Sequence, residues 1–483
     1  MTLEQNPLYR LVAPRSIAFF GASNDITAMG TSQLKSLLSM GYRGAVYPVH
    51  PTETQVQGLE AYSSVLDLPE VPDLAVLVLP TRVVPEVLEQ CGQKGIGRAI
   101  VISGGFKELG QEGAALERRL AEIAERFEMR FLGPNCLGAV NPRLGLNTTF
   151  LPYLGEPGCI GMVSQSGSFV TQMFDYIKRF GLGYSTAFSV GNEANVDLVD
   201  CLEYLAADPD TRVIALYIEG IRRGRAFLEA AQAITPHKPI VAYYVSGSAA
   251  GRQASLSHTG ALAGPDRLYD GVFRQAGISR ARSIEELFDL CSVLATCPLP
   301  RGRRVLIQTH SGGPGAAAAD ACGRLGLDLP PASAATRARL APAFPSTGSQ
   351  NNPIDITFSR NPLDYYELIP EALIEAEEAD ALLMYMMIPT EHVERIVSAM
   401  GGPEDTVEAR AAQYIEQMTR ALAAIVEAHD KPLIGFSFRS RSDVFIQVAQ
   451  RTGVAVLPSP ERAARALAAL CDYARMRERL LEP

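Results

Sequence analysis

The stretch SIAFFGASNDITAMGTSQLKSLLSM, residues 16–40, predicts the fold class of the chain. Its first six residues, Ser16–Gly21, form a short apolar run that ends in glycine, which is typical of a buried strand. A helical pattern follows near residues 31–40, and the small residues 21–23 occupy the turn before it. A strand, a tight turn and a helix in this order form the repeating unit of parallel sheets covered by helices.

The same alternation continues through most of the chain. Short β-branched runs are separated by longer helical patterns, which is typical of parallel sheets with helices on both faces. The sequence therefore predicts an α/β fold. The further strands that we expect are 45–49, 74–79, 98–102 and 130–132, then 159–163, 185–189, 213–218 and 239–244, then 305–309, 381–387, 433–438 and 454–457.

The chain is long enough for more than one domain. Its 483 residues correspond to three domains at about 150 residues each. Residues 141–158 lose the alternation and carry three prolines and three glycines, and the turn-rich basic stretch 298–304 precedes another strand. Such breaks are typical of boundaries, so we expect domains over residues 1–150, 151–300 and 301–483.

Charge and hydropathy exclude several classes of partner. The formal net charge is -9, with 44 Lys and Arg against 53 Asp and Glu, so no excess of positive charge attracts nucleic acid or anionic lipid. The most apolar run, Ala381–Pro389, is about half of what crosses a bilayer, and the first ten residues lack the apolar region of a signal peptide. We expect a cytoplasmic protein that binds neither nucleic acid nor membrane.

Cysteine and histidine spacing argues against bound metal. The eight cysteines contain no pair at the two-residue spacing of zinc ribbons, and the six histidines contain neither HExxH nor an i, i+4 pair. We expect no disulfide and no metal on this chain.

Small residues end several strands of the first third. The Gly21 turn is followed by Gly30, a G-x8-G spacing that differs from GxGxxG, and no acidic residue ends the second strand to bind a ribose. Pro80-Thr81 and Ser103-Gly104-Gly105 also follow strands, and ligands of open α/β sheets sit beyond these carboxyl ends. Either a ligand crevice or a set of purely structural turns explains the pattern, and the convergence of three loops favours the crevice.

Two later turns open helices. Ser164–Ser168 (SQSGS) and Ser311–Gly315 (SGGPG) each follow a strand and precede a helix. A helix N-terminus favours an anion through its free N–H groups and dipole. Serine is also a common helix cap, and a tight turn needs small residues, so both interpretations stay open.

The segment Gly247–Gly264 (GSAAGRQASLSHTGALAG) carries one histidine, His258, among Gly, Ala and Ser. A stretch with so little apolar bulk predicts a surface loop. A histidine there could be solvated, or Ser257 could cap a helix, but a neutral imidazole is also a nucleophile at pH 7. Glu219 ends a strand nearby and could hold one ring nitrogen while the other attacks.

Seven strings point to one family. They are FFGAS (19–23), VYPVHP (46–51), GPNCLGAVNP (133–142), SQSGS (164–168), SVGNEANVDLVDCLEYLAADPDTRVIALYIEG (189–220), SHTGALAG (257–264) and GGPGAAAADAC (312–322). Over nearly its whole length the chain resembles the α subunit of ADP-forming (NDP-forming) acyl-CoA synthetases such as acetate–CoA ligase, which are relatives of succinyl-CoA synthetase. The resemblance implies an N-terminal Rossmann-like CoA-binding domain and two flavodoxin-like domains.

The resemblance also implies roles for particular residues. His258 would be phosphorylated transiently, Glu219 would orient it, and Asn135 would lie near the thioester carbonyl. The phosphoryl group would bind at Ser166, Gly167, Gly260 and Ala261. Coenzyme A would bind at Gly21, Ser23, Pro48, Pro80, Ser103 and Gly104.

The chemistry implied by the resemblance has three steps. Phosphate attacks an acyl-CoA, His258 takes the phosphoryl group from the acyl phosphate, and phospho-His258 passes it to ADP. The acid would be acetate or a related short-chain or aryl acid. No segment resembles an ATP-grasp domain, so ATP or ADP with Mg²⁺ would bind to a separate ATP-grasp β subunit, in a heterotetramer.

Two positions depart from the family pattern. Members often carry an acid just before the histidine loop, where this chain has Ala249, and they carry Asn-Ala or Asn-Gly where it has His310-Ser311. These differences concern loop positioning and the choice of acid rather than the histidine. The alternative function is a non-catalytic protein that binds CoA or acyl-CoA and regulates; the G-x8-G turn disfavours a nicotinamide-dependent oxidoreductase.

Overall fold

A computed structural model describes most of the chain. The described residues are 2–253, 264–357, 362–387, 390–401, 403, 406–440 and 443–482. Among them, no helix is both long and apolar enough to cross a membrane; the cytoplasmic location stays a prediction. The chain divides into two compact units, residues 1–178 with 182–287, and residues 179–181 with 288–483.

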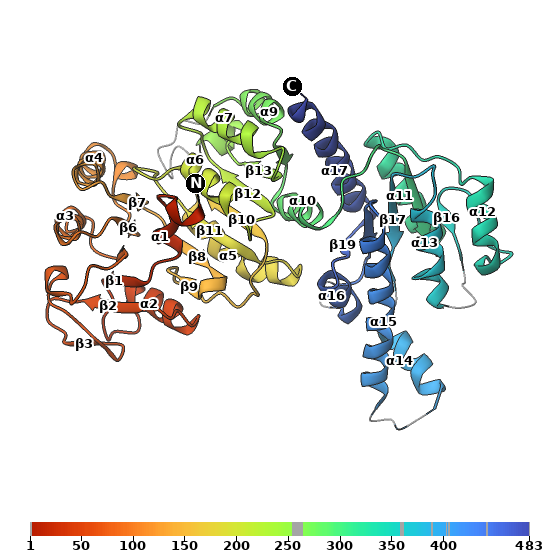
Figure 1. The fold of residues 1–483 in the computed structure, drawn as a ribbon, viewed down its shortest axis with the longest axis horizontal. Helices are drawn as coiled ribbons and strands as arrows, with labels where there is room; N and C mark the ends of the chain where they lie inside the picture. The colour runs from red at the N-terminus through yellow and green to blue at the C-terminus, as the bar shows by residue number, and fades with distance from the viewer. Residues whose placement is uncertain are drawn as a thin grey trace. The chain divides into compact units, whose positions relative to one another are not determined.

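The first sheet has five parallel strands in the order β2-β1-β5-β6-β7 (Figure 1). Side chains alternate between its two faces: Ile17 and Phe19 pack into one apolar cluster, Ala18 and Phe20 into another. Helices cover both faces, which is why β1 is buried throughout. The elements are α1 (Tyr9–Val12), β1 (Ser16–Phe20), α2 (Met29–Ser39), β2 (Ala45–Val49), β5 (Leu74–Leu77), α3 (Val84–Lys94), β6 (Arg98–Val101), α4 (Gln111–Arg126) and β7 (Arg130–Leu132), with a small hairpin, β3 (Gln55–Val56) and β4 (Leu59–Glu60).

The second sheet belongs to the same unit and has seven strands in the order β14-β13-β12-β10-β11-β8-β9. All pairs are parallel except β11–β8 and β8–β9. One apolar cluster continues from the first sheet (Phe19, Leu132) into the second (Phe188, Val196), so the two sheets share a core. The elements are β8 (Gly138–Asn141), β9 (Leu146–Asn147), β10 (Ile160–Ser164), α5 (Gly167–Arg179), β11 (Tyr184–Ser189), α6 (Leu198–Ala207), β12 (Val213–Ile218), α7 (Gly224–Ile234), β13 (Ile240–Tyr244), α9 (Asp266–Ala276) and β14 (Ser279–Ala281). They are followed by α10 (Ile284–Thr296), most of which belongs to the second unit.

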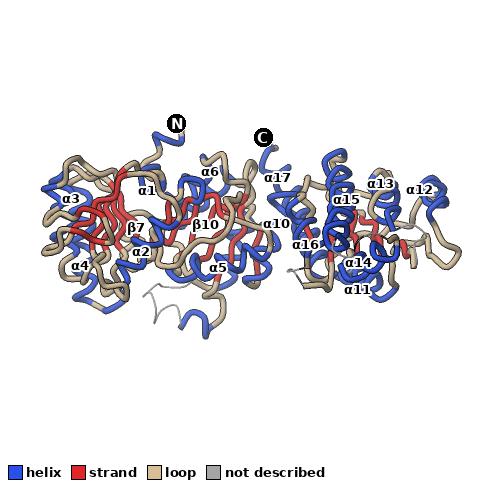
Figure 2. Tube along the Cα trace, turned by 90° about the horizontal axis from the view of Figure 1, so that it is seen from below, coloured by secondary structure: helices blue, strands red, loops and turns tan. Residues whose placement is uncertain are grey.

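The third sheet lies in the second unit and is parallel throughout, in the order β16-β15-β17-β18-β19. In both units helices lie on both sides of the strands (Figure 2). The elements are β15 (Val305–Thr309), α11 (Gly312–Arg324), α12 (Ala334–Leu340), β16 (Ile354–Asp355), α13 (Leu368–Ile374), β17 (Ala381–Tyr385), α14 (Thr390–Ala399), α15 (Val407–Ala428), β18 (Leu433–Phe436), α16 (Val444–Arg451), β19 (Ala455–Leu457) and α17 (Pro460–Leu481).

The predicted α/β fold is confirmed, with corrections at strand ends. Every predicted strand is present, but three of them end two residues earlier than expected, at Leu77, Tyr385 and Phe436. Six strands were not predicted: β3, β4, β8, β9, β14 and β16. Their two to four residues are too short to show a pattern, and β8 and β9 fall within or next to the stretch rich in Pro and Gly. The domain boundaries near residues 150 and 300 stay predictions.

Candidate functional site

Gly21 follows β1 directly and has a left-handed backbone, with φ +86°. A Cβ atom there would lie 1.9 Å from the Val78 carbonyl oxygen, so only glycine fits. Across the same turn, the Ser23 N–H donates to Thr31 Oγ1, and this hydroxyl donates back to the Ser23 carbonyl, each at 3.0 Å. The turn and the start of α2 are thus packed closely together.

The loops after β5 and β6 are joined by hydrogen bonds. The Leu79 N–H donates to Ser103 Oγ at 3.2 Å, and Thr81 Oγ1 donates to the Gly104 carbonyl at 2.5 Å. Pro80 lies in the first of these loops. Pro48 differs from the other predicted CoA residues because it lies within β2, opposite Phe19, and is buried. An edge strand is where a sheet tolerates proline.

Asn135 lies beside these loops, just after β7. Its N–H donates to the Ser103 carbonyl at 2.8 Å, and a Cβ atom on Gly104 would lie 3.1 Å from Asn135 Oδ1. Its backbone is left-handed, with φ +57°, a conformation that asparagine adopts more readily than most residues. The structure therefore brings Asn135, Ser103 and Gly104 together at the carboxyl end of the first sheet.

Gln165, just after β10, forms side-chain hydrogen bonds with the backbone of Glu219 and Gly220. Its Oε1 accepts the N–H groups of Glu219 (2.6 Å) and Gly220 (3.0 Å), while its Nε2 donates to the Gly220 carbonyl at 2.6 Å. Two N–H donors against the oxygen fix the orientation of this amide. Glu219 follows β12 and is buried, with 6% of its surface exposed.

The second Nε2 hydrogen of Gln165 is donated to Glu193 Oε2 at 2.8 Å. Glu193 lies in the loop after β11 and is buried, and its Oε1 accepts the Leu198 N–H at 2.9 Å. Burial raises the pKa of Glu193 to about 8, against the lowering effect of these two hydrogen bonds. Neither Gln165 nor Glu193 was predicted as a site residue, although both lie in strings that carried the family resemblance.

Ser166 and Gly167 lie where α5 begins. Ser164 Oγ donates to the Ser166 carbonyl at 2.8 Å, which stabilises the turn between β10 and the helix. A Cβ atom on Gly167 would meet its first neighbour, Leu137, at 3.5 Å, an ordinary contact. Sterics therefore do not require glycine at the start of this 13-residue helix.

His258, Gly260 and Ala261 lie outside the described residues. The described residues on either side of them are held together: Tyr244 Oη donates to the Gly264 carbonyl at 2.9 Å, and the Tyr244 ring stacks on Tyr269 with centroids 3.6 Å apart. Tyr269 Oη accepts the N–H of Ile221, two residues after Glu219, at 3.1 Å. The described chain from Gly264 to Tyr269 thus contacts both the end of β13 and the loop that follows Glu219.

In the second unit, His310 follows β15 and precedes α11. Its ring lies 4.9 Å from the Tyr385 ring and 5.5 Å from the Tyr365 ring, measured between centroids. Burial lowers the pKa of His310. The Ser311 N–H donates to Thr309 Oγ1 at 3.0 Å within the turn.

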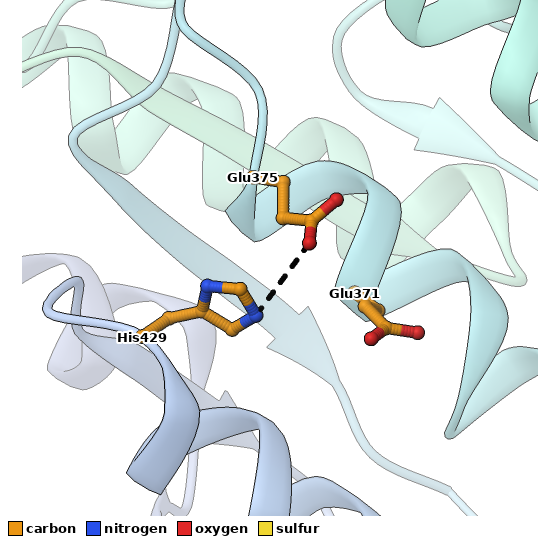
Figure 3. A group of neighbouring side chains, drawn as sticks. All are labelled: Glu371, Glu375 and His429. Atoms are coloured by element: carbon orange, nitrogen blue, oxygen red, sulfur yellow. Dashed lines mark ion pairs between the residues drawn. The ribbon is translucent and has the colours of Figure 1, made fainter.

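One group of side chains in the described part of the chain could hold a metal ion: Glu371 on α13, Glu375 just after it, and His429 after α15 (Figure 3). His429 Nε2 lies 3.9 Å from Glu375 Oε1, and Arg339 also forms an ion pair with Glu375. Both carboxylates are exposed. Arg339 already balances one of the charges, so the group does not require a cation, and the expectation of no metal on this chain stays a prediction.

Two family models match the first unit and part of α10. A CoA-binding domain matches residues 15–142, and a succinyl-CoA ligase-like flavodoxin domain matches residues 157–294. The first match contains Gly21, Ser103 and Asn135, and the second contains Gln165 and Glu219.

Named relatives match much more of the chain. It is 35% identical to the acetate–CoA ligase [ADP-forming] I subunit alpha of Pyrococcus furiosus over 97% of this chain and 98% of that one. It is 39% identical to the acetate–CoA ligase [ADP-forming] I of Archaeoglobus fulgidus over 81% of this chain, but spans only 56% of that protein.

A solved structure matches the fold. The apo form of the dinucleotide forming acetyl-coenzyme A synthetase 1 of Candidatus Korarchaeum cryptofilum superposes with a TM-score of 0.86 and 32% identity, covering 98% of this chain and 99% of that one. Fold, local site geometry and sequence identity agree, and the chain belongs to the family of ADP-forming acetate–CoA ligases and matches the α subunit of that family.

Proposed function

We propose that the chain is the CoA-binding, phosphohistidine-bearing subunit of an ADP-forming acyl-CoA synthetase. It would catalyse acyl-CoA + ADP + phosphate ⇌ carboxylate + CoA + ATP, with acetate or a related short-chain or aryl acid. The observation that carries the proposal is that one unit holds two loop clusters: Ser103, Gly104 and Asn135 at the first sheet, and Gln165 and Glu219 at the second. The loop after β11 contacts both clusters, through Gly191 beside Asn135 and Glu193 bonded to Gln165.

Coenzyme A would bind at the carboxyl ends of the first sheet, along Gly21, Ser23, Pro48, Pro80, Ser103 and Gly104. Small residues let backbone N–H groups approach phosphates, and the start of α2 adds a favourable dipole. Asn135 would donate to the thioester carbonyl oxygen as phosphate attacks the carbon. The C–S bond then breaks, CoA leaves as its thiolate, and an acyl phosphate remains.

His258 would next attack the phosphorus of the acyl phosphate. The P–O bond to the acyl group breaks, the carboxylate leaves, and phospho-His258 forms. Glu219 would accept a hydrogen bond from the other ring nitrogen and stabilise the positive charge on the ring. The N–H groups at Ser166 and Gly167, where α5 begins, and at Gly260 and Ala261 would bind the phosphoryl oxygens.

The final transfer to ADP would take place with a partner. The proposed partner is an ATP-grasp β subunit that binds ADP or ATP with Mg²⁺, assembled with this chain as a heterotetramer. Two facts support it: one relative is named as a subunit alpha, and the chain spans about half the length of another relative that is not named as a subunit.

Labelled acyl phosphates test the proposal on the chain by itself. Acetyl phosphate and a panel of short-chain and aryl acyl phosphates, each carrying ³²P, are incubated with the protein. We expect wild type to carry an acid-labile, base-stable label with at least one acyl phosphate, and His258→Ala to carry none. The control is His237→Ala, which removes an exposed histidine just before β13; its label should equal that of wild type. Equal absence of label from wild type and His258→Ala would contradict the proposed function, and CoA binding without label would favour the regulatory alternative.

A further inference from the structure

Asn192, in the loop after β11, joins both sheets of the first unit. Its side chain Nδ2 donates to Glu108 Oε2 at 2.7 Å and to Glu117 Oε2 at 2.8 Å. Its Oδ1 accepts from Asn135 Nδ2 at 3.3 Å. With 1% of its surface exposed, Asn192 is almost wholly inaccessible to water.

The backbone of the same loop fixes Asn192 against the segment before Asn135. The Asn192 N–H donates to the Pro134 carbonyl at 2.9 Å, and its carbonyl accepts from Lys107 Nζ at 2.5 Å. Gly191 lies so close that a Cβ atom would come within 2.3 Å of the Asn135 carbonyl oxygen. Neither the loop nor Asn135 can shift without the other.

The two carboxylates determine how the Asn192 amide is oriented. Both N–H groups must face Glu108 and Glu117, because the amide oxygen would be repelled by carboxylate oxygens there. The hydrogen bonds of Glu108 with Asn192, Gly105 and Phe106 outweigh its burial and hold the pKa of this carboxyl below its usual range. At least one charged acceptor therefore remains opposite Asn192 at neutral pH.

A fixed Asn192 determines the orientation of Asn135 in turn. Asn192 Oδ1 is an acceptor, so Asn135 must present its NH₂ group to it and not its oxygen. One Asn135 N–H is used in this bond, and the second is left for another acceptor. Without Asn192, the Asn135 amide could rotate and present its oxygen instead.

We propose that Asn192 is a positioning residue for acyl-CoA recognition, which selects the amide orientation in which Asn135 donates to the thioester carbonyl. This inference rests on the proposed function, since it needs an acyl-CoA beside Asn135. The ligand class is specific: a CoA thioester with a carbonyl oxygen, not CoA or a CoA thioether.

Binding of acetyl-CoA and of S-ethyl-CoA to the full chain tests the inference. The thioether keeps the two-carbon group but lacks the carbonyl oxygen, so the ratio of the two dissociation constants reports the carbonyl contact alone. For Asn192→Ala we expect acetyl-CoA to bind about tenfold more weakly and S-ethyl-CoA to bind within about twofold of wild type. Asn195→Ala is the matched control, because Asn195 lies in the same loop but its Oδ1 accepts the Phe131 N–H at 3.0 Å. The ratio of the two dissociation constants should not change in this variant.

A double-mutant cycle separates positioning from a merely structural role. If Asn192 acts through Asn135, the double variant Asn192→Ala/Asn135→Asp should have the same ratio of acetyl-CoA to S-ethyl-CoA dissociation constants as Asn135→Asp alone. Additive effects, or an equal loss for both ligands, would overturn the inference. If circular dichroism shows that Asn192→Ala does not fold, Glu108→Gln supplies the same test, because it places an NH₂ group opposite the Asn192 amide.

The wild-type chain separates this inference from the proposed function. A wild-type chain that binds neither ligand would contradict both. A wild-type chain that prefers acetyl-CoA, with the same preference in Asn192→Ala, would overturn the inference and leave the proposed function standing.

Discussion

The first and third sheets, one in each unit, have the same strand order, but the loops beyond the carboxyl ends of the strands differ in chemistry between the two units. In the first unit, the loops beyond the strands contain a buried polar network in which Asn192 bonds to Asn135, Glu108 and Glu117. In the second unit, the turn after β15 carries His310, whose ring packs against Tyr365 and Tyr385. A parallel sheet supplies the place for a site, and the residues on its loops determine the chemistry.

The strand-to-helix turns provide the sharpest contrast. Gly21→Ala places a Cβ atom 1.9 Å from the Val78 carbonyl oxygen at φ +86°, so we expect a loss of about 3 kcal/mol in the stability of the first unit. Gly312→Ala, at the equivalent turn of the third sheet, meets Asp355 at 3.6 Å and should change stability by less than about 0.5 kcal/mol. Native-state hydrogen exchange of β1 and β15 amides measures both, and equal losses would show that the turns do not differ.

Asn135→Asp tests whether the polar network takes part in acyl transfer or only stabilises the fold. Aspartate tolerates the left-handed backbone and keeps the side-chain shape, but it removes both N–H donors. We expect phosphorolysis of acetyl-CoA to fall by about 100-fold, as when one oxyanion-hole donor is lost.

The control for this variant lies in the other unit. Ser311→Ala, in the turn that opens α11, should leave the rate of phosphorolysis within about twofold of wild type. If Asn135→Asp and Ser311→Ala lower the rate equally, the first unit has no special role in acyl transfer.

Glu117 makes the stability of the first unit depend on pH. Burial raises the pKa of Glu117 to about 7, with Asn192 opposing the shift and Glu108 adding to it; Lys107 Nζ lies 3.8 Å away. A carboxyl whose pKa is raised on folding contributes stability below its unfolded pKa, and this contribution is lost as pH rises through the folded pKa. We expect urea unfolding to show a loss of about 2 kcal/mol between about pH 4.5 and 7.5 that Glu117→Gln abolishes. A pH dependence unchanged in this variant would contradict the assignment.

His310 should make the stability of the second unit depend on pH in the opposite direction and by a smaller amount. Its pKa is lowered by burial, so its contribution to stability is present above its unfolded pKa, about 6.5, and is lost as pH falls below it. His310→Phe keeps an aromatic ring beside Tyr385 and should remove this acid-side loss. Hydrogen exchange of β15 amides at pH 7.5 and 5.5 compares the two proteins, and identical pH responses would refute the prediction.

The sequence predicted the parts of the fold that have strong local patterns. The apolar run 381–389 contains the buried strand β17, and the Gly21 turn connects β1 to α2, as their residues indicated. β8 and β9 could not be foreseen, because β8 pairs antiparallel with β11, about 45 residues later, β9 pairs with β8, and both have little alternation of their own. Pairing across such distances depends on tertiary contacts, not on local propensity.

The candidate site was predictable only in part. Ser103 and Gly104 were expected at the crevice, and Asn135 near the thioester carbonyl. The three residues lie together, while the roles of all the predicted site residues stay predictions. Asn192 and Gln165 were missed, although their strings were recognised. A polar side chain after an apolar strand does not by itself reveal that it will be buried and bonded to residues about 55 positions away in the chain.

The central claim is that the first unit converts acyl-CoA and phosphate to an acyl phosphate and passes its phosphoryl group to His258. Incubation of the chain with acetyl-CoA and ³²P-phosphate, followed by mapping of the labelled peptide, tests it most directly. We predict one acid-labile label within residues 247–264, on His258, which is absent when acetyl-CoA is replaced by S-ethyl-CoA. A label on another residue, or the same label without a thioester, would contradict the account.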